Sequence, residues 1–199
     1  MTSSIDHVLA ALDAPRYSLR DALPALPDAA GLYAIHGSGA VWEALRLGEP
    51  VAHLPLYVGK AEDSLVTRDL KTHFRNGRTG SSTVRRTFAA LLRADLGLAG
   101  MPRNPAKPGH FSNYGLSPSD DQRLTEWMRA HLEIAVWATD GSQPLRDLER
   151  NVLRRLNPPL NIQGVDHRWK AQVQSCRAAM AAEARAWKIV SDPNSPSSV

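Results

Sequence analysis

Short apolar runs bounded by glycine and proline predict three β-strands. Residues 31–35 (Gly-Leu-Tyr-Ala-Ile) are apolar and β-prone, and turn residues follow them. Residues 54–59 form a second such run, in which Pro55 suits the beginning of a strand or an edge position. Residues 132–138 alternate in polarity and contain isoleucine and valine, which predicts a third strand. Residues 41–47 fit either a helix or a strand.

Amphipathic periodicity predicts helices in most of the remaining chain. The clearest helix covers residues 144–156 and ends before Asn157-Pro158-Pro159; its apolar stripe consists of Leu145, Leu148, Val152, Leu153 and Leu156. A helix over residues 82–92 begins at a serine cap, Ser81 or Ser82. Other helices are expected at residues 4–12, 61–74, 119–132 and 168–187, with a short helical turn at 18–23.

This order of elements predicts an α+β fold: a small, mainly antiparallel three-stranded sheet flanked by helices, with extra helices at both ends. We expect an N-terminal helical extension at residues 1–28 and a central domain at 29–165. An insertion of loop and helix occupies about 76–131 of that domain, including an irregular stretch at 97–120. A C-terminal helix at 166–190 and a disordered tail at 191–199 complete the expected organisation.

Cysteine content and hydropathy exclude several classes of protein. The single cysteine, Cys176, rules out a disulfide within the chain and argues against a cysteine-based zinc site. No apolar run approaches the length of a membrane span, and residues 1–12 lack the pattern of a signal peptide. The sequence therefore predicts a soluble, cytoplasmic protein that does not interact with a membrane.

Basic residues are concentrated in one part of the chain. The formal net charge is only +4, which is compatible with a polyanionic partner without establishing one. Residues 68–86, however, contain six basic residues and only one acidic residue, Asp69. The basic residues are Arg68, Lys71, Arg75, Arg78, Arg85 and Arg86. The loop at 76–83 adds hydroxyl groups and backbone amides, a mixture that suits phosphate binding, although a solvated basic helix would also have this composition.

Four separated segments carry the candidate chemistry. Tyr33 and Tyr57 lie on the first two predicted strands beside glycine, which permits a close approach of another group, although strand tyrosines are ordinarily core residues. Arg68 and His73 share one predicted helix. Glu149 borders the apolar stripe of the helix at 144–156, and a carboxylate near a basic cluster is what a Mg²⁺-bound phosphate site requires.

Taken together, these segments resemble the GIY-YIG nuclease superfamily. Residues 30–33 are similar to the first motif strand of the family, and residues 56–61 (Leu-Tyr-Val-Gly-Lys-Ala) to the second. Arg68 resembles the helix arginine, His73-Phe74 the histidine-aromatic pair, and Glu149 the metal-binding glutamate, with Asn161 closing a Pro-x-x-Asn segment. The chain departs from the family in the long insertion at 35–55 and in the five-residue step from Arg68 to His73, where the family usually has four.

The resemblance implies a metal-dependent endonuclease that hydrolyses DNA phosphodiester bonds. The implied catalytic residues are Tyr33, Tyr57, Arg68, His73 and Glu149, and the implied supporting residues are Gly31, Gly59, Lys60 and Asn161. Glu149 would bind Mg²⁺ (or Mn²⁺), Arg68 would contact the phosphate, and one of the two tyrosines would orient or deprotonate the water. Lys71, Arg75, Arg78, Arg85 and Arg86 are expected to contact the DNA.

Two other functions fit the sequence. The chain could be a non-cleaving DNA-binding module built on a nuclease-like domain, or an interaction protein whose tyrosines are core residues and whose basic stretch is surface. Metal-dependent cleavage discriminates the nuclease from both.

Overall fold

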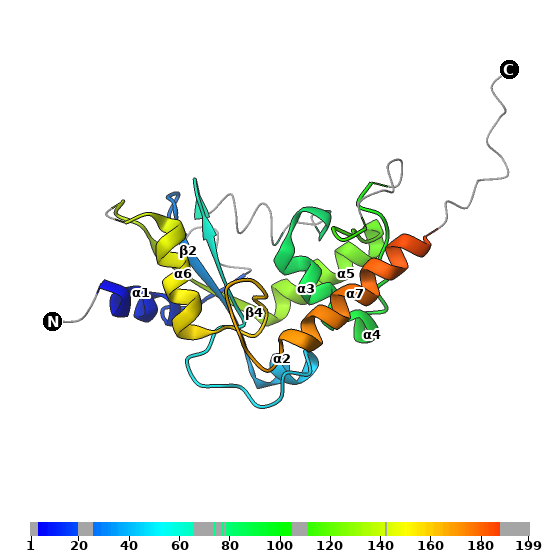
Figure 1. Ribbon diagram of the computed structural model, residues 1–199, viewed down its shortest axis with the longest axis horizontal. Coiled ribbons are helices and arrows are strands. Elements are labelled where there is room, and N and C mark those ends of the chain that lie inside the picture. The colour runs from blue at the N-terminus through cyan, green and yellow to red at the C-terminus, as the bar shows by residue number, and fades with distance from the viewer. Residues whose placement is uncertain are drawn as a thin grey trace, which may run out of the picture.

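The computed structural model describes residues 4–19, 26–65, 74, 77, 79–104, 111–141 and 143–187. Figure 1 shows an elongated molecule, with the sheet, α1 (Ser4–Asp13) and α6 (Leu145–Leu156) at one end. The helices α3 (Thr83–Leu91), α4 (Arg93–Leu96), α5 (Pro118–His131) and α7 (Lys170–Ala186) gather at the other end. The α+β class and the helices at both ends are confirmed.

The described strands form one antiparallel sheet in the order β1-β4-β2-β3. Three of them are the predicted strands: β2 (Gly31–Gly37), β3 (Tyr57–Ala61) and β4 (Leu132–Ala138). The fourth strand, β1 (Tyr17–Ser18), was not predicted. The prediction that a helical turn begins at Ser18 was wrong, because Tyr17 and Ser18 pair with Ile134 and Glu133 of β4.

The central strand β2 is buried on both faces, which explains its continuous apolar sequence. Leu32 and Ala34 point into a core formed with α1 and α6. Tyr33 and Ile35 point into the larger core, to which α3, α5 and α7 contribute. The sheet is therefore a layer between two sets of helices, and its β3 edge lies beside α6.

The helix boundaries follow the capping and breaking residues of the sequence. Ser82 caps α3 by accepting a hydrogen bond from the Arg85 amide, as predicted. The ambiguous segment at 41–47 contains the helix α2 (Gly39–Ala44), within the insertion between β2 and β3. The helix expected to begin at Ala61 does not begin there, because Ala61 ends β3 and pairs with Gly31. A short 3₁₀ turn (Thr79–Ser81) precedes α3.

Two further expectations concern the chain outside these elements. No helix of the described ranges is both long and apolar enough to cross a membrane. The tail at 191–199, expected to be disordered, lies outside the described residues.

A buried histidine joins the N-terminal helix to the sheet. His36 on β2 is 2% exposed, and its Nε2–H donates to the Leu12 carbonyl oxygen at 2.8 Å. Burial lowers the pKa of the His36 imidazole from 6.5 to about 4, against a smaller opposing effect of the Leu12 hydrogen bond. The folded protein therefore holds this imidazole neutral well below the pH at which the unfolded chain protonates it.

Acidification is expected to destabilise the protein through His36. Between pH 6.5 and 4 the unfolded state binds the additional proton, so the free energy of unfolding decreases as the pH falls through this range, by up to about 3 kcal/mol. Urea denaturation from pH 7 to pH 4 measures the effect. His36→Gln, which keeps a donor for Leu12, should lack this component, whereas the exposed His7→Gln should retain the wild-type profile. An unchanged profile in His36→Gln would contradict the assignment.

Candidate active site

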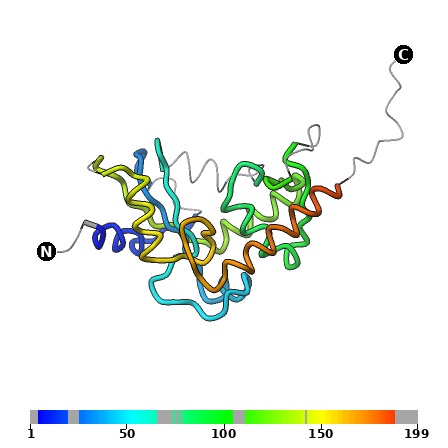
Figure 2. The backbone as a smooth tube through the Cα atoms, in the orientation of Figure 1, coloured from blue at the N-terminus to red at the C-terminus, as the bar shows by residue number. Residues whose placement is uncertain are grey.

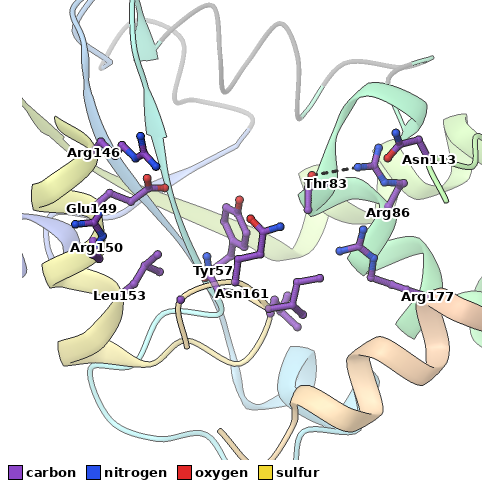
Figure 3. Close-up of a pocket in the computed structure, with 14 residues that line it drawn as sticks. Tyr57, Thr83, Arg86, Asn113, Arg146, Glu149, Arg150, Leu153, Asn161 and Arg177 are labelled. Atoms are coloured by element: carbon purple, nitrogen blue, oxygen red, sulfur yellow. Dashed lines mark hydrogen bonds between the residues drawn. The ribbon is translucent and has the colours of Figure 1, made fainter. Parts of the chain in front are cut away.

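A cleft of about 590 Å³ opens between α6 on one side and α3 with α7 on the other, with Tyr57 of β3 between them (Figure 3). The connection between α6 and α7 passes along the same edge of the sheet (Figure 2) and contributes part of the lining. The charged and polar lining residues among those described are Tyr57, Thr83, Arg86, Asn113, Arg146, Glu149, Arg150, Asn161, Gln163 and Arg177.

Glu149 lies at the border of the buried stripe of α6. Its neighbour Leu148 is buried against the sheet, whereas the Glu149 side chain is 22% exposed and faces the cleft (Figure 3). Its Oε2 atom lies 4.0 Å from Nζ of Lys60 on β3, and Lys60 also pairs with Glu62. The Glu149 carboxylate therefore combines partial burial with access to the cleft, the placement that a carboxylate ligand of a metal ion requires.

The two motif tyrosines lie on the same face of the sheet. Tyr33 is opposite Gly59 in the register, and Tyr57 is opposite Ile35, which makes the tyrosines diagonal neighbours. Their ring centroids are 6.1 Å apart. Tyr33 is only 1% exposed, whereas Tyr57 lines the cleft with its hydroxyl-bearing ring beside Asn161 (Figure 3).

Both motif glycines are required by close contacts. A Cβ atom on Gly59 would lie 2.4 Å from Oη of Tyr33. The Tyr33 ring can therefore pack against β3 at this position only because residue 59 has no side chain. A Cβ atom on Gly31 would lie 2.1 Å from the Trp137 carbonyl oxygen of β4. The close neighbour is thus a tyrosine ring at one glycine and backbone at the other.

Asn161 occupies the free edge of β3. Its Oδ1 accepts from the Val58 amide at 2.9 Å, and its Nδ2 donates to the Val58 carbonyl at 2.8 Å. The amide of Leu160 donates to the Leu56 carbonyl at 2.9 Å along the same edge. The Asn161 side chain therefore pairs with β3 as a peptide group of another strand would, and it covers an edge that would otherwise be open.

Arg85 does not line the cleft. The side chain is 0% exposed, and its Nη2 lies 3.0 Å from Oδ1 of Asp121 and 2.8 Å from Oγ1 of Thr125 on α5. Burial lowers the pKa of the Arg85 guanidinium despite the opposing charge of Asp121. This burial contradicts the expectation that Arg85 contacts DNA; instead, Arg85 joins α3 to α5.

Arg86, the next residue, does line the cleft. It is 6% exposed; Nη1 donates to the Gly80 carbonyl at 2.9 Å, and Nη2 donates to Oγ1 of Thr83 at 3.1 Å. Its place on the cleft is compatible with the expected phosphate contact.

A model of the GIY-YIG catalytic domain matches residues 47–179, about two thirds of the 199 residues. The chain belongs to the GIY-YIG family. The resemblance found in the sequence is thereby confirmed. No curated protein and no solved structure matches the chain.

The GIY-YIG match covers all the described lining residues of the cleft but not the first motif strand. Tyr57, Glu149 and Asn161 lie within the matched residues, whereas Gly31 and Tyr33 precede them. The sheet nevertheless unites both parts, because β2 pairs with β3 along its length. Five of the expected site residues lie outside the described residues: Arg68, Lys71, His73, Arg75 and Arg78.

The cleft fits a metal ion that is only partly held by protein. Within the described ranges there is no group of three or more histidine, cysteine or acidic side chains that could hold a metal, and Glu149 is the one carboxylate among the described lining residues. Mg²⁺ commonly binds through one or two carboxylates and completes its coordination with waters and substrate phosphate oxygens. Glu149 is suited to that mode of binding.

Three arginines of the cleft were missed by the sequence interpretation: Arg146, Arg150 and Arg177. The sequence alone could have identified Arg146, because it precedes Glu149 by three residues and therefore shares the same face of the helix. Arg177 gave no comparable signal, since it lies in an alanine-rich helix that joins the cleft only through tertiary packing.

Loss of the Asn161 side chain is expected to destabilise the protein. Asn161→Ala leaves the Val58 amide and carbonyl without their partners and should reduce the free energy of unfolding by about 3 kcal/mol. Urea denaturation measures this change. Asn113→Ala is the matched control, because Asn113 is an exposed asparagine of the same cleft, and it should change stability by less than about 0.5 kcal/mol. Equal effects of the two variants would show that the Val58 contacts contribute little.

Proposed function

We propose that this protein is a metal-dependent endonuclease that hydrolyses DNA phosphodiester bonds in the cleft between α6 and α3. One observation carries the proposal: a single carboxylate, Glu149, faces Tyr57 across a cleft whose other charged lining residues, among those described, are arginines. The arginines of such a site attract a polyanion. Its carboxylate, Glu149, lies where a metal ion could bind between the protein and a phosphate.

Glu149 is the proposed ligand of Mg²⁺ or Mn²⁺. Bound there, the ion would offset the negative charge of the scissile phosphate and of the leaving oxygen. Lys60, whose Nζ lies 4.0 Å from the Glu149 carboxylate, adds a cationic group beside the proposed metal site.

Tyr57 is the proposed contact of the attacking water. It lines the cleft, whereas Tyr33 is buried behind it, so the hydroxyl of Tyr57 is the one within reach of solvent and substrate. An unperturbed tyrosine titrates near pH 10, so deprotonation of water by Tyr57 needs neighbouring positive charge. Arg86, which interacts electrostatically with Tyr57, is a cationic group of this kind.

The remaining roles follow the family motif. We propose that Arg68 binds the scissile phosphate through its planar guanidinium and that His73 assists in proton transfer. Lys71, Arg75 and Arg78 remain proposed DNA contacts, and Asn161 holds β3 against the segment that follows α6. Tyr33, Gly31 and Gly59 support this arrangement by fixing the packing of β2 against its neighbours.

Nicking of supercoiled plasmid tests the proposal. The wild-type protein should nick the plasmid with Mg²⁺ and should be inactive with EDTA. Glu149→Gln, which removes the charge but keeps the shape, should lower the rate at least about 100-fold, because metal stabilisation of the transition state contributes several kcal/mol. Gel electrophoresis over time measures the rates.

Glu133→Gln is the matched control, since Glu133 is an exposed glutamate on β4 away from the cleft, and it should nick as the wild type does. Nicking by Glu149→Gln at the wild-type rate would exclude Glu149 from the chemistry. DNA binding without nicking by the wild type would favour a non-cleaving DNA-binding module.

A further inference from the structure

Two arginines from different helices meet on the wall of the cleft opposite Glu149. Arg86 belongs to α3 and Arg177 to α7, and these two helices pack against each other. Figure 3 shows both side chains on the side away from α6, with Tyr57 and Asn161 lying between them and Glu149. Neither arginine is part of the motif through which the family was recognised in the sequence.

This pair carries positive charge that the described part of the protein does not neutralise. Neither Arg86 nor Arg177 has a carboxylate within 4.0 Å among the described ion pairs. By contrast, Arg150 of the same cleft pairs with Asp147 at 3.2 Å, and Arg85, beside Arg86, pairs with Asp121. Burial and the positive charge of Arg177 lower the pKa of the Arg86 guanidinium to about 10.

Both guanidinium groups also retain unused donors. Among the described residues, the buried atoms Nε of Arg86 and Nη1 of Arg177 have no hydrogen-bond partner. Arg86 is more than nine-tenths buried, and its two Nη atoms are held by Gly80, Thr79 and Thr83, so the guanidinium is fixed in position. Buried donors without partners are costly and rare in folded proteins, which indicates that an acceptor from outside the chain completes the site.

We propose that Arg86 and Arg177 together bind a non-scissile phosphate of the DNA strand while Glu149 serves the scissile one. This inference rests on the proposed function for the identity of the polymer. A phosphodiester has two unshared oxygens and one negative charge, which suit two neighbouring guanidinium groups on one wall of a cleft. Because both sites line one continuous cleft, two phosphates of the same strand would fix the direction in which that strand crosses Tyr57.

DNA binding in EDTA tests the site apart from cleavage. Fluorescence anisotropy with a fluorescein-labelled 20-base-pair duplex, repeated over a series of salt concentrations, gives affinity and salt dependence. Arg177→Gln should bind about 10-fold more weakly at moderate salt, and the slope of log K against log salt should fall by about 0.9, the value for one lost phosphate contact. Arg177 is the residue to change first, because Arg86 also holds the backbone of the preceding turn.

Arg155→Gln is the matched control, because Arg155 is an exposed arginine of α6 that pairs with Asp6 outside the cleft, and it should bind as the wild type does. Wild-type affinity and slope in Arg177→Gln would overturn the proposal, as would an equal loss in the control or no binding by the wild type at low salt. Weaker binding by Arg177→Gln upholds the phosphate site even if the wild type fails to nick plasmid. Nicking with unaffected binding in Arg177→Gln upholds the nuclease alone.

Discussion

The site depends on the pair of hydrogen bonds between the Asn161 side chain and the backbone of Val58. These bonds attach the segment that follows α6 to the free edge of β3, and the neighbouring bond from Leu160 to Leu56 extends the attachment. Because Asn157-Pro158-Pro159 connects α6 to this segment within a few residues, fixing Asn161 also limits where α6 can lie. Glu149 consequently faces the same edge strand that carries Tyr57 and Lys60.

The electrostatics of the cleft follow from how the helices are assembled. Leu148 and Val152 bury one face of α6 against the sheet, which leaves Glu149 at the border and turns Arg146 and Arg150 towards the opening. The opposite wall receives one arginine from α3 and one from α7. A cleft with one carboxylate and several arginines is unfavourable without an anionic occupant, and the phosphates of the proposed DNA strand would supply the missing negative charge.

The sequence predicted those features that depend on local pattern. The alternation at 132–138 located β4, the leucine stripe located α6, and Ser82 located the beginning of α3. Features that depend on distant partners escaped prediction: Arg85 belongs to a basic run, but Asp121, which neutralises it, is 36 residues away. Arg177 likewise reaches the cleft only because α7 packs on α3. The motif residues Tyr57, Glu149 and Asn161 were identified because their spacing matches a family, and their proximity to one cleft required the structure.

Diffraction from crystals of the protein bound to an uncleaved DNA duplex and soaked with Mn²⁺ tests the central claim most directly, because the anomalous signal locates the ion. The account predicts a peak about 2 Å from a carboxylate oxygen of Glu149, on the side that faces Tyr57 and in contact with a phosphate oxygen of the DNA. A bound duplex with the manganese peak on other protein ligands, or with none at Glu149, would contradict it.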